Sequence, residues 1–214
     1  MSTSVATANR GRPKDPAKRT AILEAAKRLF LSGGFSGTSM DAVAKEASVS
    51  KLTVYSHFSD KETLFSAAVE AKCHNTLPEP LFDLDVSIPI RASLTRIGLA
   101  FVELIHSKEV VALERLMCAM ATQDPQMSRL FFEAGPQRTL NAMENLINRA
   151  NEAGLLATPD PKHAAESFFS LLQGCEHMRT LIGIREPMTA IEAQPHVERA
   201  VDMFLRANGP ERQD

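Results

Sequence analysis

Hydrophobic and polar positions follow one another along the first part of this chain with the period of an α-helix. Between Pro16 and Ser32 the apolar residues recur at intervals of three and four, which predicts one long amphipathic helix. They are Ile22, Ala25, Ala26, Leu29 and Phe30. Gly33 and Gly34 come next, and glycine is typical of the residues at which helices end. We therefore expect the first helix to run from about Pro16 to Ser32.

Two shorter helices joined by a tight turn are predicted between Thr38 and Lys61. Thr38 and Asp41 have the three-residue spacing of a capping box, which satisfies amide groups at a helix start. Residues 47–50 form the turn, and Ser50 is placed to cap the second helix. Such a pair is typical of a helix-turn-helix, whose second helix enters the major groove of DNA. A pair of capped helices in an ordinary bundle is the alternative.

The second helix of this pair runs from Lys51 to Phe58, and three of its side chains are expected to face the core. These are Leu52, Tyr55 and Phe58. At the N-terminal end of this helix, Ser50, Lys51 and Thr53 can reach base edges or nearby phosphates. Ser59 and Glu62 predict a further capping box, at the start of the helix that follows.

This region closely resembles the N-terminal domain of TetR/AcrR-family transcriptional regulators. The residues that carry the resemblance are GGF after the first helix, then TSMD, then V-S-K-x-T-V-Y-x-H-F-x-x-K-E-x-L. The resemblance covers about residues 17–65, and Leu52 departs from it because the family often carries glycine there. Residues 131–156 are similar to the ligand-binding domain of the AefR-like subgroup.

The resemblance implies which residues contact DNA. Thr53, Tyr55 and His57 are expected to touch the duplex, the last two mainly through phosphates. Lys61 is expected to hold a phosphate, because its charge adds to the amide dipoles at the helix start. Thr38 and Ser39 are expected to do the same at the first helix of the pair. Two alternatives stay open, that Tyr55 belongs to the core and that His57 is only a solvated polar residue.

A basic arm precedes the first helix. Arg10, Gly11, Arg12 and Pro13 resemble the core of an AT-hook, an extended element of the A·T-rich minor groove. In this interpretation Arg10 and Arg12 contact DNA. The alternative is a disordered basic tail that raises non-specific affinity alone.

The remainder of the chain is also expected to be helical. One helix runs from near Asp60 to Asn75, and residues 77–89 form the linker after it. Further helices are predicted near residues 90–106, 109–122, 125–134, 136–153, 161–183 and 195–207. Four of these helices have a proline in the first turn, where it costs no hydrogen bond. Pro195 is the proline of the last helix and marks its expected start.

The helix predicted at residues 161–183 is apolar on more than one side, which suggests one face in the core and another against a partner. The resemblance implies that the last two long helices of each subunit form a four-helix dimer interface. The interface candidates are Phe169, Leu172, Val197, Val201 and Phe204. A buried helix in a monomer is the alternative.

Nine methionines and eleven phenylalanines suit an adaptable apolar cavity. The candidate ligand-binding residues are Arg115, Met117, Met120, Phe131, Met143, Phe168, Gln173 and His177. The resemblance implies a small, largely apolar effector, whose binding repositions the linking helix and separates the two recognition helices of the dimer.

Charge is unevenly distributed along the 214 residues, whose net charge is −2. Residues 1–65 hold ten Lys and Arg against six Asp and Glu, whereas residues 66–214 hold fourteen against twenty. This distribution favours contact between the N-terminal part and phosphates. The three cysteines are an odd, widely spaced set, and no secretory signal or membrane-spanning run is found, so we expect a cytoplasmic protein with reduced thiols.

Enzyme signatures are weak. Phosphate-binding and dinucleotide motifs are absent, and the glycine spacing of residues 34–37 is wrong for a nucleophile elbow. Cys175, Glu176 and His177 are consecutive on a helix and point in different directions, so we expect no metal site and no cofactor. A helical enzyme that works in its C-terminal cavity is the alternative, and it would turn over a small molecule without binding DNA.

The sequence thus predicts an all-α protein with an N-terminal three-helix helix-turn-helix DNA-binding domain and a C-terminal helical ligand-binding and dimerisation domain. The expected divisions are a disordered basic arm (1–15), the DNA-binding domain (16–65), the ligand-binding and dimerisation domain (66–207) and a tail (208–214). The expected function is a homodimeric regulator that binds double-stranded DNA at a palindromic operator and is released by a small-molecule effector. Repression, as opposed to activation, rests on family analogy alone.

Overall fold

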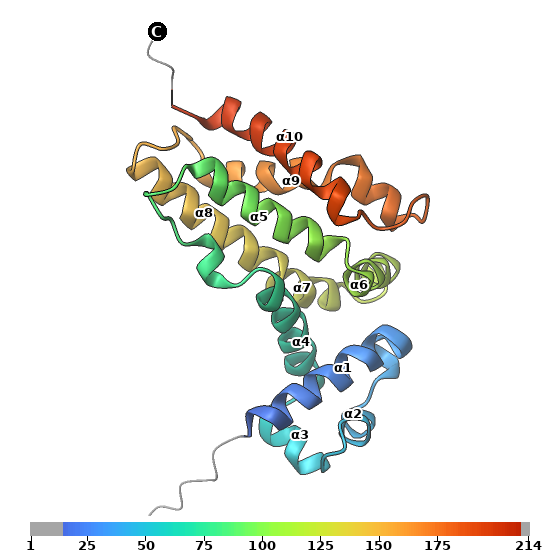
Figure 1. Ribbon diagram of the computed structural model, residues 1–214. Coiled ribbons are helices and arrows are strands. Elements are labelled where there is room, and N and C mark those ends of the chain that lie inside the picture. The colour runs from blue at the N-terminus through green and yellow to red at the C-terminus, as the bar shows by residue number, and fades with distance from the viewer. Residues whose placement is uncertain (1–14, 211–214) are drawn as a thin grey trace, which may run out of the picture. The chain divides into compact units, whose positions relative to one another are not determined.

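The computed structural model describes residues 15–210, which fold into α-helices, one 3-10 helix and the loops between them (Figure 1). The all-helical fold class is therefore confirmed. The chain divides into two compact units, residues 1–64 and residues 65–214. The helix α4 begins in the first unit and ends in the second.

The N-terminal unit contains α1 (Pro16–Gly37), α2 (Met40–Glu46), α3 (Lys51–His57) and the first residues of α4 (Lys61–Thr76). The predicted apolar stripe of α1 is buried except for Leu29, which is half-buried, and Leu23 joins it. The break expected after this helix is found at Gly34, whose φ of 69° lies in the left-handed region that glycine adopts easily. One further turn then continues to Gly37.

The two capping boxes predicted in this unit are wrong, because in each case the capping residue lies one position later in the sequence. Ser39, not Thr38, caps α2, because its hydroxyl accepts the Ala42 N–H at 3.1 Å. Asp60, not Ser59, caps α4, because its carboxylate accepts the Thr63 N–H at 2.7 Å. The predicted cap of α3 is confirmed, since the Ser50 hydroxyl accepts the Thr53 N–H at 3.1 Å.

The buried face of α3 also differs from the prediction. Phe58, which follows α3 directly, is buried as expected, but Val54 is the other residue that faces the core. Leu52 is 81% exposed and Tyr55 is 43% exposed, so placing these two inward is wrong. The reason is helical phase: Val54 and Phe58 lie four residues apart on one face, which turns Leu52 to the opposite side.

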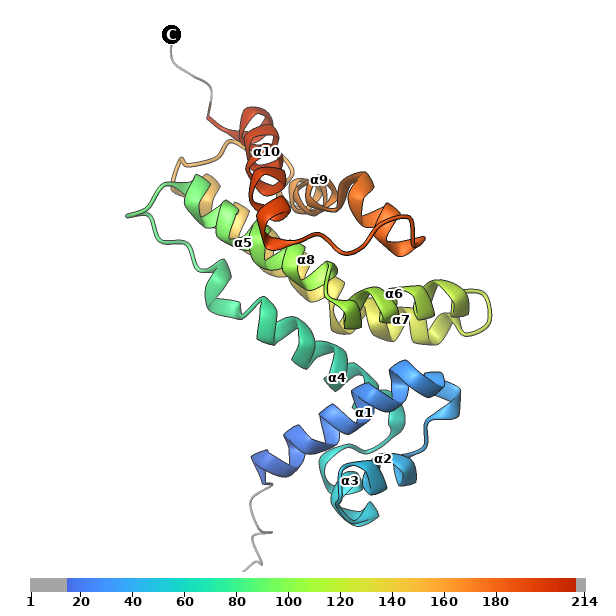
Figure 2. The same cartoon turned by 45° about the vertical axis from the view of Figure 1, so that its right-hand side comes forward.

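The C-terminal unit is a helical bundle (Figure 1, Figure 2). After α4 it contains η1 (Glu79–Phe82), α5 (Ile90–Ile105), α6 (Lys108–Met120), α7 (Pro125–Ala134), α8 (Pro136–Glu152), α9 (Pro161–Leu181) and α10 (Ala190–Asn208). The core lies among α5, α8, α9 and α10, which pack on one another. Its largest fully buried side chains include Leu94, Ile97, Met143, Leu146, Ile147, Phe168, Leu172 and Phe204.

The last helix begins earlier than predicted. Thr189 and Glu192 form a capping box, so α10 starts at Ala190 and Pro195 lies inside the helix. A proline inside a helix removes one main-chain hydrogen bond, and for this reason Pro195 by itself predicts a helix start. The true start signal in the sequence is the capping box of Thr189 and Glu192.

The helix α9 is interrupted at Gly174, whose φ of 49° and ψ of −165° are outside the helical region. Nε2 of His196, on α10, lies 2.7 Å from the main-chain oxygen of Leu172 next to the break. Beyond the break, the next buried side chain of α9 is His177, five residues after the buried Leu172. An unbroken helix would bury the residue four positions after Leu172. The two segments of α9 therefore bury different faces, and the large apolar side chains beyond the break, Met178 and Ile182, are exposed.

Within residues 15–210, no helix is both long enough and apolar enough to cross a membrane.

Candidate nucleic-acid interface and cavity

A shallow open hollow of about 500 Å³ lies where α2, α3 and α4 begin. Four of the predicted DNA-contacting residues line it with exposed or half-exposed side chains, namely Ser39, Lys51, Tyr55 and Lys61. The structure thus brings together residues that are up to 22 positions apart in the sequence. Ser50, Thr53 and His57 also lie on or beside α3, but they do not line this hollow.

Lys51 is exposed, yet its charge is already paired. Its Nζ lies 2.7 Å from Oδ1 of Asp41 and 3.0 Å from Oδ2. The hydrogen bond to this carboxylate raises the pKa of Lys51 above its ordinary value. Lys51 therefore joins the start of α3 to α2, and its ammonium group also lies 5.9 Å from the ring centre of Tyr55.

Lys61 is also engaged by its own unit. Its Nζ donates to the main-chain oxygen of Phe35 at 2.8 Å and lies 4.2 Å from the centre of the Phe35 ring. These contacts hold the start of α4 against the end of α1. An ammonium group has three N–H donors, so phosphate contact by Lys61 remains compatible with this anchoring.

Thr38 also lines the hollow, but its hydroxyl proton is already used and is not available to a phosphate, in contrast to the prediction. Thr38 is buried, and its Oγ1 donates to the main-chain oxygen of Gly34 at 2.8 Å. This bond closes the end of α1 at the glycine break. Ser39 remains exposed at the cap of α2. The predicted contacts of Arg10 and Arg12 lie outside the described residues.

The other residues of α3 differ in how freely they can meet DNA. Oγ of Ser50 and Oγ1 of Thr53 are 2.8 Å apart and share a hydrogen bond. His57 is half-buried and its ring lies tilted against Phe58. Tyr55 is too exposed to be mainly a core residue. The outward side of α3 therefore presents Lys51, Leu52, Tyr55 and Ser56 as exposed side chains.

The C-terminal unit contains a cavity of about 350 Å³ with mostly apolar walls. Its wall residues come from each α-helix from α4 to α9. The aromatic side chains that line it are Phe101, Phe131, Phe132 and Phe169. The polar and charged ones are Lys72, Glu114, Thr139, Glu166, Ser170 and Gln173.

The sequence located few of these residues. Phe131 and Gln173 line the cavity as predicted. The other six do not line it, and for them the prediction is wrong: Arg115, Met117, Met120, Met143, Phe168 and His177. Met143 and Phe168 are fully buried in the core, and Arg115 donates to the main-chain oxygens of Thr180 and Leu181. Periodicity finds apolar residues but cannot separate a core position from a cavity wall.

Cys73 lies in the wall of this cavity, on α4. Burial raises the pKa of its thiol to about 11. The side chain is therefore a neutral thiol near neutral pH and behaves as a small apolar group.

A buried polar cluster lies beside the cavity wall. Nδ1 of His106 accepts the Met188 N–H at 3.0 Å, and the His106 ring meets the ring of His177 edge-on. Nε2 of His177 lies 3.1 Å from Oε2 of Glu114, a residue that lines the cavity. Burial is the main cause that lowers the pKa of His106 to about 4, and the charge of His177 acts in the same direction.

The depressed pKa of His106 predicts acid sensitivity. The unfolded chain protonates this residue near pH 6.5, whereas the folded protein resists protonation until about pH 4. Stability should thus fall as the pH drops from 6.5 towards 4, by about 2–3 kcal/mol from this group. Urea unfolding at pH 7.5 and 4.5 measures the loss, and His106→Asn, which keeps an acceptor for Met188, should lose less. Equal losses in both proteins would contradict this assignment.

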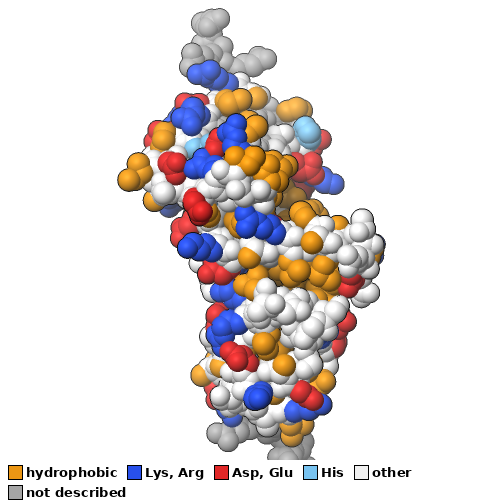
Figure 3. All heavy atoms as spheres, turned by 90° about the vertical axis from the view of Figure 1, so that its right-hand side faces the viewer, with side chains coloured by type: hydrophobic (Ala, Val, Ile, Leu, Met, Phe, Trp, Pro, Cys, Tyr) orange, Lys and Arg blue, Asp and Glu red, His pale blue; other side chains and the backbone are white. Residues whose placement is uncertain are grey.

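The predicted dimer-interface residues face their own subunit. Phe169, Leu172, Val197, Val201 and Phe204 are at most 5% exposed and belong to the core, so the assignment is wrong. A different set of large apolar side chains is 56–87% exposed on α9, α10 and the loop between them: Met178, Ile182, Ile184, Ile191 and Met203. Hydrophobic side chains gather on the face of the C-terminal unit that includes the loop between α9 and α10 (Figure 3).

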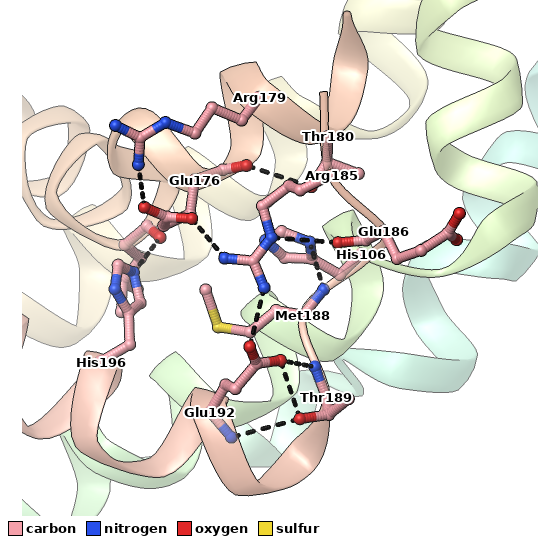
Figure 4. Close-up of polar contacts among 11 residues, drawn as sticks. His106, Glu176, Arg179, Thr180, Arg185, Glu186, Met188, Thr189, Glu192 and His196 are labelled. Carbon is pink, nitrogen blue, oxygen red and sulfur yellow. Dashed lines mark hydrogen bonds and ion pairs between the residues drawn. The ribbon is translucent and has the colours of Figure 1, made fainter. Parts of the chain in front are cut away.

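Polar contacts fix the segment that carries these exposed side chains. Arg185 lies between Glu176, on α9, and Glu192, on α10 (Figure 4). Glu192 also accepts the Thr189 N–H at 2.8 Å, and the Glu176 carboxylate binds Arg179 as well. The loop between α9 and α10 is therefore anchored to both helices and to His106, the residue that follows α5.

Among the residues that the structure describes, no three His, Cys, Asp or Glu side chains are grouped as a metal site would require. Cys175 is exposed whereas His177 is buried, so these two point in different directions.

Comparison with known proteins identifies both parts of the chain. Residues 22–68 match bacterial regulatory proteins of the tetR family, and residues 92–210 match the C-terminal domain of AefR-like transcriptional repressors. The uncharacterized HTH-type transcriptional regulator YdeS of Bacillus subtilis is 38% identical over 71 residues. That match covers 33% of this chain and 36% of YdeS, so it spans about a third of this curated relative.

Two solved structures are similar over nearly the whole chain. The flavonoid-responsive regulator FrrA is 32% identical, with a TM-score of 0.73, and the match covers 92% of this chain and 100% of FrrA. A TetR family transcriptional regulator from Pseudomonas syringae pv. tomato is 26% identical, with a TM-score of 0.67, over 91% of this chain and 98% of its own.

Proposed function

The chain belongs to the TetR family of DNA-binding transcriptional regulators, with an AefR-like C-terminal domain, and on this basis we propose that it is a repressor. In this proposal a homodimer occupies a palindromic operator, and a small-molecule effector releases it. The family confirms the expectation that the chain is not an enzyme.

The single observation that carries the DNA-reading role is the outward face of α3. Val54 and Phe58 fix this helix from behind, and Ser50 caps it, so its free side is held in one orientation. Ser39, Lys51, Tyr55 and Lys61 surround the hollow beside it, where phosphates can be bound. The helix therefore enters the major groove, and its flanks contact the backbone.

Dimerisation is supported by the exposed apolar side chains of α9, α10 and their loop. A single helix-turn-helix reads few base pairs, and a two-fold dimer doubles the site and makes the operator palindromic. Large apolar groups gathered on one face favour a protein partner over water. The anchoring of the loop by Arg185 presents them in a fixed arrangement, which reduces the entropy lost on association.

Release by an effector is supported by the cavity. Its volume of about 350 Å³ suits a small molecule, and four phenylalanine rings suit an aromatic one. The similar regulator FrrA is flavonoid-responsive, and we propose a planar aromatic effector of this kind. α4 contributes Val69, Lys72 and Cys73 to the wall and begins at Lys61, so effector binding acts on the helix that carries Lys61.

Selection of duplexes from a random library by the purified chain tests the proposal. We expect two-fold symmetric sequences, bound with an affinity that falls steeply as salt rises. A flavonoid such as quercetin should then weaken operator binding by about 5- to 150-fold, the usual range of such coupling. Binding without sequence preference would refute the proposal that the chain is a sequence-specific regulator. An effector that stabilises the protein but leaves operator affinity unchanged would refute the proposed release from the operator.

A further inference from the structure

Among residues 15–64, the described part of the DNA-binding unit, Leu52 is the most exposed large apolar residue, with 81% of its surface open to solvent. It occupies the second position of α3 and points away from the core that Val54 and Phe58 build. A leucine in this position is not buried by its own subunit and does not contribute to the core. Its surface is available for a contact made by the outward face of α3.

The neighbours of Leu52 are already engaged. Lys51 is paired with Asp41 at 2.7 Å, and the hydroxyl of Thr53 shares a hydrogen bond with Ser50 at 2.8 Å. A base contact from either would first have to break or share these interactions. Leu52 has no polar group to satisfy, so it meets a base edge without any such cost.

The chemistry of the major groove identifies what Leu52 can recognise. Donors and acceptors make up most of each base edge there, and the C5-methyl group of thymine is the distinctive apolar feature. We propose that Leu52 packs against a thymine methyl in each half-site and thereby selects T·A at that position. The inference rests on the proposed function, because it requires α3 to enter the major groove.

This assignment changes the role expected for Lys51. Its ammonium group ties α3 to α2 through Asp41, and it supports the orientation of Leu52 instead of choosing the base. Sequence discrimination at this position then depends on an apolar contact, and removing the methyl group from the DNA is equivalent to removing the leucine from the protein.

The test uses the operator obtained by selection and replaces each thymine in turn with deoxyuridine, which lacks only the C5-methyl group. At one symmetric position we expect wild-type affinity to fall about fourfold per half-site, and about 15-fold when both are replaced, the size expected for one buried methyl group. Leu52→Ala should bind the thymine operator more weakly and should no longer distinguish thymine from deoxyuridine. Because Leu52 is exposed, this variant should melt at the wild-type temperature.

Two controls sharpen the result. Ser56→Ala, on an exposed position of the same helix, should keep the full preference for thymine. Wild type should also prefer 5-methylcytosine over cytosine at the same position, because both cytosines offer the same hydrogen-bonding groups and differ only by the methyl. Leu52→Ala should bind these two equally.

The possible outcomes are distinct. Equal affinity of the wild type for thymine and deoxyuridine at every position would overturn the inference and leave the proposed function intact. A Leu52→Ala variant that still prefers thymine would overturn it as well. A chain that selects no duplex sequence would overturn the proposed function, and the inference with it.

Discussion

A Met178→Glu/Ile182→Glu double variant should sediment as a monomer and bind its operator about 100-fold or more weakly than the wild-type chain. The two side chains are 58% and 61% exposed, with Met178 in the last turn of α9 and Ile182 four residues later at its C-cap. In a two-fold dimer they would be buried against the partner, and an unpaired buried charge costs about 3–5 kcal/mol. The monomer would then bind half an operator.

Sedimentation velocity and operator titration measure this effect. Val86→Glu is the matched control, because Val86 is also a well-exposed apolar residue but lies in the loop before α5. It should remain dimeric and bind DNA normally. A double variant that stays dimeric would place the interface elsewhere on the subunit, and our proposed interface would be wrong.

Replacing Gly98 with valine should destabilise the C-terminal unit by about 3 kcal/mol. Gly98 lies on α5 where the helix packs tightly against Val197 of α10 and Leu172 of α9. A Cβ atom at this position would lie 2.6 Å from Cγ1 of Val197 and 3.2 Å from Cδ2 of Leu172. Both neighbours are fully buried in the core and cannot move aside, so α5 and α10 would be forced apart.

Urea unfolding at one fixed protein concentration measures this loss, because the stability of a dimer depends on concentration. Ala92→Val is the control, because it places valine on an exposed position of the same helix. That control should lose less than about 1 kcal/mol, the range of helix propensity. Similar losses in the two variants would mean that the close approach at Gly98 is unimportant.

The positions of most helices could be predicted from the sequence, because periodicity, prolines and glycines are local signals. The recognition helix was also located, through the spacing of residues that resemble the family. The sequence did not predict which side of this helix faces the core. α3 carries apolar residues on both sides, and a pattern cannot tell Val54, which packs inside, from Leu52, which faces out.

The same limit explains the errors in the C-terminal unit. Phe169 and Leu172 are apolar at helical spacing, and this spacing is shared by a subunit core, a cavity wall and a dimer interface. Only the tertiary packing assigns Phe169 to the core and the cavity wall and Met178 to the surface. The break at Gly174 adds to the difficulty, because it shifts the buried face of α9 within one apparently continuous helix.

The raised pKa of Cys73 determines how this thiol reacts with molecules that enter the cavity. Alkylating agents and oxidants attack the thiolate form of cysteine, and this form is scarce when the pKa is about 11. Cys118 and Cys175 are exposed and are the thiols that such reagents would reach. A molecule that enters the cavity therefore meets sulfur as a packing surface, and it can leave again chemically unchanged.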